Sequence, residues 1–237
     1  MCDRCAGIGR RGFLNLAAGA LSAAALSISM ARPAFALAAP SLTPDDALSK
    51  LKAGNEKFVR GPELCALELT RQRADVAKSQ APWATILACS DSRVSPELIF
   101  GGVGLGELFV ARNAGNTVDV ATLGTIEYGA EHLGSPVVVV LGHSRCGAVA
   151  AACDVVQKHT NLPGSMGPMV AAIVPAARTV FGKPGDFVDN AVRENARRTA
   201  LKITTQSRIV EDLARAGKVK VVYARYDLDS GVVEFLS

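Results

Sequence analysis

The sequence has little net charge, few aromatic side chains and no long apolar segment. Its net charge is +4 over 237 residues, and 5% of the residues are aromatic. Residues 1–36 hold four arginines and one aspartate, so removing them from the 26 basic and 22 acidic residues of the chain leaves 22 and 21. Such a balance gives no indication of nucleic acid or a membrane surface as a partner. The hydrophobic content of 49% is sufficient for one sizeable core.

Residues 1–36 have the features of an export signal. A basic start contains an Arg-Arg pair at positions 10 and 11, which resembles the twin-arginine export motif, and a small-x-small cleavage pattern ends at Ala36. The Ala- and Ser-rich stretch at 16–30 is shorter than the ~20 apolar residues of a membrane span, which disfavours a transmembrane anchor. We expect cleavage after Ala36, export by the twin-arginine machinery, a periplasmic location and no stable membrane anchor. Lipidation at Cys2 or Cys5 is a less favoured alternative.

The remainder is predicted to be a short linker at 37–42 and one α/β domain at 43–237. Thr43 and Pro44 suit the start of a helix, and Leu48, Leu51 and Phe58 fall on one face of it, which predicts an N-terminal helical arm. Further helices are expected at 67–78, 120–133, 148–156 and 188–216, and strands at 83–88, 108–111, 137–141 and 218–224, with a C-terminal hairpin through 232–236. Alternating strands and helices predict an open, mainly parallel β-sheet flanked by helices.

Two short polar segments carry the chemistry. Cys89 follows one predicted strand, and His143 and Cys146 follow another. The carboxyl ends of neighbouring parallel strands meet at one edge of a sheet, so these three side chains can converge. Two Cys and one His suit zinc and leave its fourth tetrahedral position open, which indicates a catalytic site. A structural zinc site or a redox disulfide is the alternative, but Cys65 and Cys153, the other cysteines of the body, lack the spacing of a zinc knuckle.

Several motifs in order resemble those of the β-class carbonic anhydrases. The similarity spans residues 43–236 and includes Cys89-Ser90-Asp91-Ser92-Arg93, Glu107-Leu108-Phe109-Val110-Ala111-Arg112-Asn113-Ala114-Gly115, Ile126-Glu127-Tyr128 and His143-Ser144-Arg145-Cys146-Gly147. The resemblance implies reversible hydration of carbon dioxide to bicarbonate and a proton, with Zn²⁺ as cofactor and a zinc-bound hydroxide as nucleophile. It also implies a homodimer or a dimer of dimers.

The resemblance assigns a role to each site residue. It implies that Cys89, His143 and Cys146 bind zinc and that Asp91 and Arg93 form the catalytic pair. In the branch that is similar to the plant enzymes, Gln80, Phe109 and Tyr128 occupy the positions of a substrate pocket built partly across the dimer interface. The other branch has a Trp where this chain has Ile86, so we do not expect its inhibition by bicarbonate.

The chemistry of zinc bound by two thiolates and one imidazole explains why Asp91 and Arg93 accompany the three ligands. Two thiolates cancel the formal charge of zinc and make it a weaker acid, so a carboxylate that accepts a hydrogen bond from the zinc-bound hydroxide would help. Arg93 can hold Asp91 by a bidentate fork that Lys could not reproduce, and so keep it from occupying the open position. The family contains both arrangements, and the sequence does not decide whether a closed state with Asp91 on zinc occurs here.

Other interpretations are less favoured. Members with the same zinc set hydrolyse carbon disulfide or carbonyl sulfide, and a non-catalytic bicarbonate-binding protein would need neither Asp91 nor Arg93. The glycine-rich run at 102–106 precedes a predicted strand instead of opening a helix, which indicates a turn and not a phosphate loop. Cys65 and Cys153 are expected to be buried thiols or one disulfide.

Overall fold

The computed structural model describes residues 42–61 and 69–236. The predicted export signal, all but the last residue of the linker, and Cys65 lie outside the described residues. The two alternatives for Cys65 and Cys153, buried thiols or one disulfide, therefore both stay predictions.

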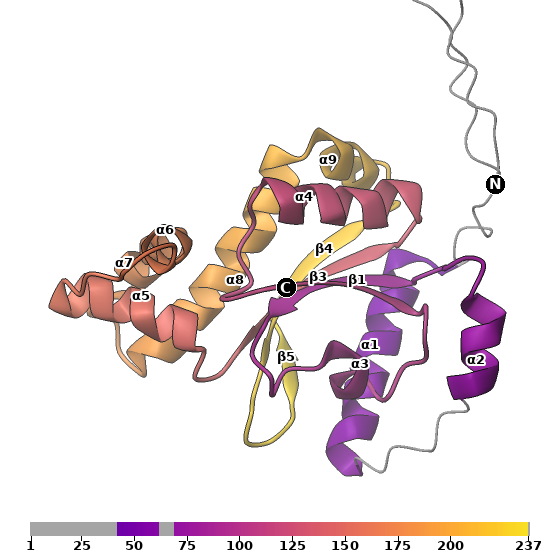
Figure 1. Ribbon diagram of the computed structural model, residues 1–237, viewed down its shortest axis with the longest axis horizontal. Helices are drawn as coiled ribbons and strands as arrows, with labels where there is room; N and C mark the ends of the chain where they lie inside the picture. Colours follow the sequence, from indigo (N-terminus) through magenta and orange to yellow (C-terminus); the bar gives the residue numbers. More distant parts are fainter. Residues whose placement is uncertain (1–41, 62–68, 237) are drawn as a thin grey trace, which may run out of the picture. The chain divides into compact units, whose positions relative to one another are not determined.

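A five-stranded sheet forms the centre of the described residues (Figure 1). Its order is β2-β1-β3-β4-β5; the first four strands are parallel and β5 is antiparallel to β4. The strands are β1 (Ala84–Cys89), β2 (Leu108–Asn113), β3 (Val137–His143), β4 (Lys220–Tyr226) and β5 (Val233–Phe235). Every residue of β1 and β3 is buried, as expected of central strands that are covered on both faces. The predicted open, mainly parallel sheet and the C-terminal hairpin are confirmed.

Helices cover both faces of this sheet (Figure 1). The described helices are α1 (Pro44–Arg60), α2 (Leu69–Val76), α3 (Pro96–Ile99), α4 (Val120–Glu127), the π-helical turn η1 (Tyr128–His132), α5 (Gly147–Lys158), α6 (Met166–Ala171), α7 (Val174–Val180), α8 (Phe187–Gln206) and α9 (Arg208–Arg215). Of these, α5, α6 and α7 pack together and against α8 beyond one end of the sheet (Figure 1). Successive strand residues point to opposite faces, so Ile86 packs with α1 and α3 while Leu87 packs with α4 and α8. None of the helices in the described part of the chain combines the length and apolar character that a bilayer crossing requires.

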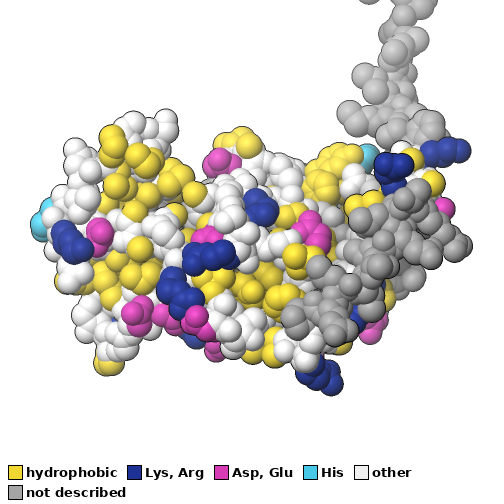
Figure 2. Space-filling model, turned by 60° about the horizontal axis from the view of Figure 1, so that its bottom comes forward, with side chains coloured by type: hydrophobic (Ala, Val, Ile, Leu, Met, Phe, Trp, Pro, Cys, Tyr) yellow, Lys and Arg dark blue, Asp and Glu magenta, His cyan; other side chains and the backbone are white. Residues whose placement is uncertain are grey.

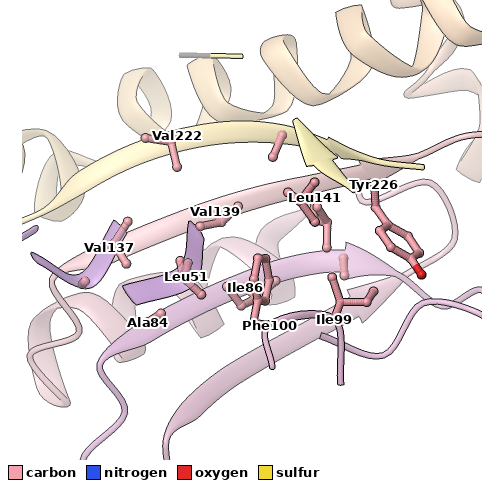
Figure 3. Packing of buried hydrophobic residues seen from close by; sticks show 14 of the residues in the cluster. Leu51, Ala84, Ile86, Ile99, Phe100, Val137, Val139, Leu141, Val222 and Tyr226 are labelled. Carbon is pink, nitrogen blue, oxygen red and sulfur yellow. The ribbon is translucent and has the colours of Figure 1, made fainter. Parts of the chain in front are cut away.

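The N-terminal helix α1 is part of the core and does not stand apart as an arm. Thr43 caps it, because the backbone N–H of Asp46 donates to the Thr43 hydroxyl at 3.1 Å. Leu51 is fully buried beside Ile86, Val139 and Phe100, as Figure 3 shows. The apolar face predicted for this helix therefore covers the chain's own sheet.

The single helix predicted over 188–216 is wrong, because the structure has two helices there. α8 ends before Ser207, and α9 begins after it. The Ser207 hydroxyl accepts a hydrogen bond from the Val210 N–H at 3.1 Å and donates one to Glu127 at 2.6 Å. A serine that caps a helix with its side chain favours a new start over continuation. Three further short helices, α3, α6 and α7, were not predicted from the sequence.

Candidate metal centre

The three predicted ligands converge at the carboxyl edge of the sheet. Cys89 is the last residue of β1, His143 is the last residue of the adjacent strand β3, and Cys146 immediately precedes α5. All three are buried, and their ligand atoms lie within 4.8 Å of one another. Long-range strand pairing thus brings together residues that lie far apart in the sequence.

The spacing of the two sulfur atoms fits a metal site and not a disulfide. The Sγ atoms of Cys89 and Cys146 are 3.9 Å apart, and both cysteines are free. A disulfide requires about 2.05 Å. Two thiolates on one tetrahedral zinc, each with a bond of about 2.3 Å, would lie about 3.8 Å apart. The observed distance therefore suits chelation of one ion by both sulfurs.

His143 presents one free ring nitrogen to this cluster. Its side chain is fully buried, and its Nδ1 lies 3.0 Å from the carbonyl oxygen of Ser144. A carbonyl oxygen only accepts, so Nδ1 carries a proton, and in the neutral ring Nε2 then has a bare lone pair. Among the described residues, Nε2 is one of three buried side-chain N or O atoms with no hydrogen-bond partner. A metal ion would use that lone pair, and the Nδ1 contact would fix the orientation of the ring.

The contact between the two sulfur atoms affects the pKa of both thiols. The contact with the Cys146 sulfur lowers the pKa of Cys89, and the N–H of Gly115, 3.4 Å from the Cys89 sulfur, adds to this effect. The same contact and burial raise the pKa of Cys146, against the opposing influence of the Val149 and Ala148 amides at the start of α5. A divalent cation would remove the repulsion between two thiolates and so ionise both.

Asp91 and Arg93 form a bidentate pair beside the cluster. Nε of Arg93 donates to Oδ1 of Asp91 at 2.9 Å, and Nη2 donates to Oδ2 at 2.7 Å. The backbone N–H of Arg93 also donates to Oδ1 at 3.0 Å. The side-chain hydrogen bonds from Arg93 hold the pKa of Asp91 well below its usual range. Oδ2 of Asp91 lies 3.9 Å from Nε2 of His143, so an ionised carboxylate stands next to the ligand atoms.

The structure brings Phe109 and Tyr128 together, but away from the metal ligands of the same chain. Their ring centroids are 5.9 Å apart, and Tyr128 is 47% exposed. Phe109 is paired with Thr85, four residues before Cys89, which corresponds to about 13 Å along the strand. Gln80 is exposed in the segment between α2 and β1.

Sequence reasoning missed the residues that hold the two ligand loops. Arg112 donates to the carbonyl oxygens of Cys89 and Asp91. Arg145 forms a bidentate pair with Asp229, at 2.6 and 2.9 Å, and thereby ties the His143–Cys146 loop to the turn after β4. Arg112 and Arg145 lie within the quoted motifs, but contacts with backbone carbonyls and distant turns leave no spacing signal in the sequence.

Gly115 is required by the backbone at this site. Its φ is +82°, which favours glycine, and a Cβ there would lie 2.5 Å from Cδ1 of Ile173. This conformation also directs its N–H to the Cys89 sulfur. The glycine of the motif is therefore explained by a positive φ and by a close approach together.

The fold and the cluster define an α/β protein with a candidate metal site, and comparison with known proteins identifies its family. The family model described as carbonic anhydrase matches residues 84–233. Carbonic anhydrase 2 of Mycobacterium tuberculosis is 36% identical over 194 residues, which cover 81% of this chain and 92% of that protein. The carbonic anhydrase of Mycolicibacterium smegmatis is 34% identical over 200 residues, covering 84% and 96%.

Solved structures agree with this result. The β-carbonic anhydrase of Coccomyxa, determined in complex with acetazolamide, is 29% identical, with a TM-score of 0.63 over 80% of this chain and 86% of that one. The β-carbonic anhydrase CafA of Aspergillus fumigatus is 26% identical, with a TM-score of 0.63 and coverage of 81% and 91%. The chain belongs to the β-class carbonic anhydrase family.

Proposed function

We propose that this protein catalyses the reversible hydration of carbon dioxide to bicarbonate and a proton, with zinc held by Cys89, His143 and Cys146. The observation that carries the proposal is the convergence of two thiols and a bare imidazole nitrogen beside a carboxylate held by Arg93. When bound, zinc lowers the pKa of a water ligand so that hydroxide is available near neutral pH.

Asp91 would act as a fixed hydrogen-bond acceptor next to the metal centre. Because Arg93 keeps the pKa of Asp91 low, the carboxylate stays ionised and can accept a hydrogen bond at the site without taking up the proton. The bidentate contact also restrains the carboxylate from moving toward the ligand cluster, 3.9 Å away at His143. We propose that the closed arrangement, with Asp91 as a fourth ligand, becomes accessible only when this pair opens.

The substrate pocket would require a second copy of the chain. β2 is an edge strand among the described strands, its side chains are largely half-buried, and Val120 at the start of α4 is 92% exposed. Figure 2 shows another view of the surface, on which apolar side chains lie between charged ones. We infer a homodimer, or a dimer of dimers, in which Phe109 and Tyr128 of one subunit form an apolar wall near the metal centre of its partner, with Gln80 as a donor to a substrate oxygen. The β-carbonic anhydrases solved from Sordaria macrospora are tetrameric.

Export to the periplasm by the twin-arginine machinery completes the proposal. That route carries folded proteins, so zinc could bind Cys89 and Cys146 while both thiols are reduced in the cytoplasm. N-terminal sequencing of the protein from a periplasmic fraction should find Leu37 as its first residue. Full-length chain retained in the cytoplasm would contradict this.

Stopped-flow measurement of carbon dioxide hydration tests the activity. The zinc-loaded protein should hydrate carbon dioxide, lose the activity on chelation and regain it when zinc is restored. Asp91→Ala should lower kcat strongly, whereas Asp212→Ala, which removes an exposed carboxylate paired with Arg215 on α9, should leave it unchanged. A zinc-loaded wild-type protein with no activity above the uncatalysed rate would refute the proposal.

A further inference from the structure

Arg112 at the end of β2 joins the two functional residues of the Cys89–Arg93 loop through their backbone. Its Nε donates to the carbonyl oxygen of Cys89 at 2.9 Å, and its Nη2 donates to the carbonyl oxygen of Asp91 at 2.7 Å. Both distances lie within the normal range for N–H···O bonds, and both donors belong to one planar, charged group. A single guanidinium therefore spans the residue with the metal-binding thiol and the residue with the carboxylate.

The register of the sheet explains why these carbonyl groups need a side-chain donor. Cys89 is the last residue of β1 and lies opposite Asn113 of β2; one step further, the Ser90 N–H donates to the Asn113 carbonyl oxygen at 3.1 Å. After this bond the loop leaves the ladder. Arg112 is paired with Ala88, and its side chain continues past the end of the ladder to the loop. The Asp91 carbonyl oxygen also accepts from the Val94 N–H at 3.0 Å, so it is held from two sides.

We propose that Arg112 is a positioning residue of the metal centre, which fixes the backbone from which the Cys89 thiolate and the Asp91 carboxylate project. This inference rests on the proposed function, because it concerns the same centre. Metal ligands and catalytic groups must be held within about 0.5 Å of their working geometry, and side chains transmit any shift of the backbone that carries them.

Arg112 and Arg93 hold different parts of the same residue. Arg93 binds the Asp91 carboxylate, whereas Arg112 binds the Asp91 carbonyl oxygen and, through Cys89, links it to the metal ligands. Without Arg112 the Asp91–Arg93 pair could still form, but it could shift as a unit relative to the Cys89 sulfur. Loss of Arg112 should therefore weaken metal binding and lower kcat, while KM stays unchanged.

The test compares Arg112→Met and Arg112→Lys with wild type and with a matched control, Arg197→Met. Arg197, which is exposed on α8, also makes two bonds, both at 2.8 Å, but to the Glu194 carboxylate and not to a backbone of the site. Zinc affinity is measured by competition with a chromophoric chelator, kcat and KM by stopped-flow hydration, and the thermal midpoint by circular dichroism. Arg112→Met should raise the zinc dissociation constant and lower kcat by about tenfold or more. Arg112→Lys, which can reach one carbonyl oxygen but not both, should fall between Arg112→Met and wild type.

The outcomes separate this inference from the proposed function. Wild-type zinc affinity and kcat in Arg112→Met would overturn it, whatever happens to the thermal midpoint, because a merely structural arginine would change stability alone. If Arg112→Met does not fold, Arg112→Lys decides: zinc affinity equal to wild type would overturn the inference. A wild-type protein that binds zinc without hydrating carbon dioxide would refute the proposed function, while the comparison of zinc affinities would still decide the role of Arg112.

Discussion

Gly115→Ala should destabilise the protein and weaken its metal centre. The substitution adds a Cβ at a residue with φ of +82°, 2.5 Å from Cδ1 of Ile173 and 3.2 Å from Cβ of Ala148. A left-handed conformation costs a residue other than glycine about 1–2 kcal/mol, and overpacking costs about 1–3 kcal/mol. The expected total is about 2–5 kcal/mol, which for a chain of this size lowers the thermal midpoint by about 4–20 °C.

Two other glycines separate the contributions of backbone and packing. Gly182 has φ of +79° with nothing within 4 Å of an added Cβ, so Gly182→Ala should show the conformational cost alone. Gly124 lies in helix α4 and also has open space around it, so Gly124→Ala should be neutral or slightly stabilising. All variants are measured by thermal unfolding at equal protein concentration and equal zinc loading.

A second measurement links the packing at Gly115 to the metal centre. The Gly115 N–H donates to the Cys89 sulfur, so a shifted backbone at this position should also raise the zinc dissociation constant. Gly182→Ala should leave zinc affinity unchanged. Equal thermal midpoints for Gly115→Ala and Gly182→Ala, with equal zinc affinity, would refute the reasoning.

Further predictions concern the acid pair, the turn after β4, the buried thiol and the metal. Arg93→Lys keeps a charge but loses the fork on Asp91, so stopped-flow kcat should fall about 10- to 100-fold with zinc still bound; activity near wild type would contradict this. Hydrogen bonds from Ser230 lower the pKa of Asp227 to about 2, so the contribution of Asp227 to the free energy of unfolding is present above about pH 4 and lost as the pH falls to about 2. The difference in urea midpoint between metal-free wild type and metal-free Asp227→Ala should therefore disappear over that range. A difference that persists below about pH 2 would contradict this. Burial raises the pKa of Cys153 to about 11, so peptide mapping after iodoacetamide treatment at neutral pH should find it unmodified in the folded protein, and rapid labelling would show that it is accessible. Chelation of zinc should lower the thermal midpoint, and an unchanged midpoint would indicate that the metal does not bind the folded state preferentially.

The fold was predictable where the sequence pattern is continuous. The apolar run at 137–141 and the strand before Cys89 are found as β3 and β1, because a strand covered on both faces needs apolar residues throughout. The break at Ser207 was not predictable, because its effect depends on Glu127, which is distant in the sequence and accepts the hydrogen bond from its hydroxyl. The short helices α6 and α7 likewise depend on packing against α5 and α8 more than on their own periodicity.

The candidate site was likewise predictable from the sequence only in part. Cys89, His143 and Cys146 were predicted to converge, because each lies at or just beyond the carboxyl end of a strand of one parallel sheet. The supporting contacts of Arg112 and Gly115 depend on backbone geometry that forms only after the strands have paired. The separation of Phe109 and Tyr128 from these ligands follows from the register of β2, which sequence periodicity does not specify.

X-ray absorption at the zinc edge tests the central claim most directly. The zinc-loaded protein should show two sulfur ligands at about 2.3 Å and two nitrogen or oxygen ligands at about 2.0–2.1 Å, and Cys146→Ser should remove one of the sulfurs. A spectrum with no sulfur ligand, or one that Cys146→Ser leaves unchanged, would show that this cluster does not hold the metal.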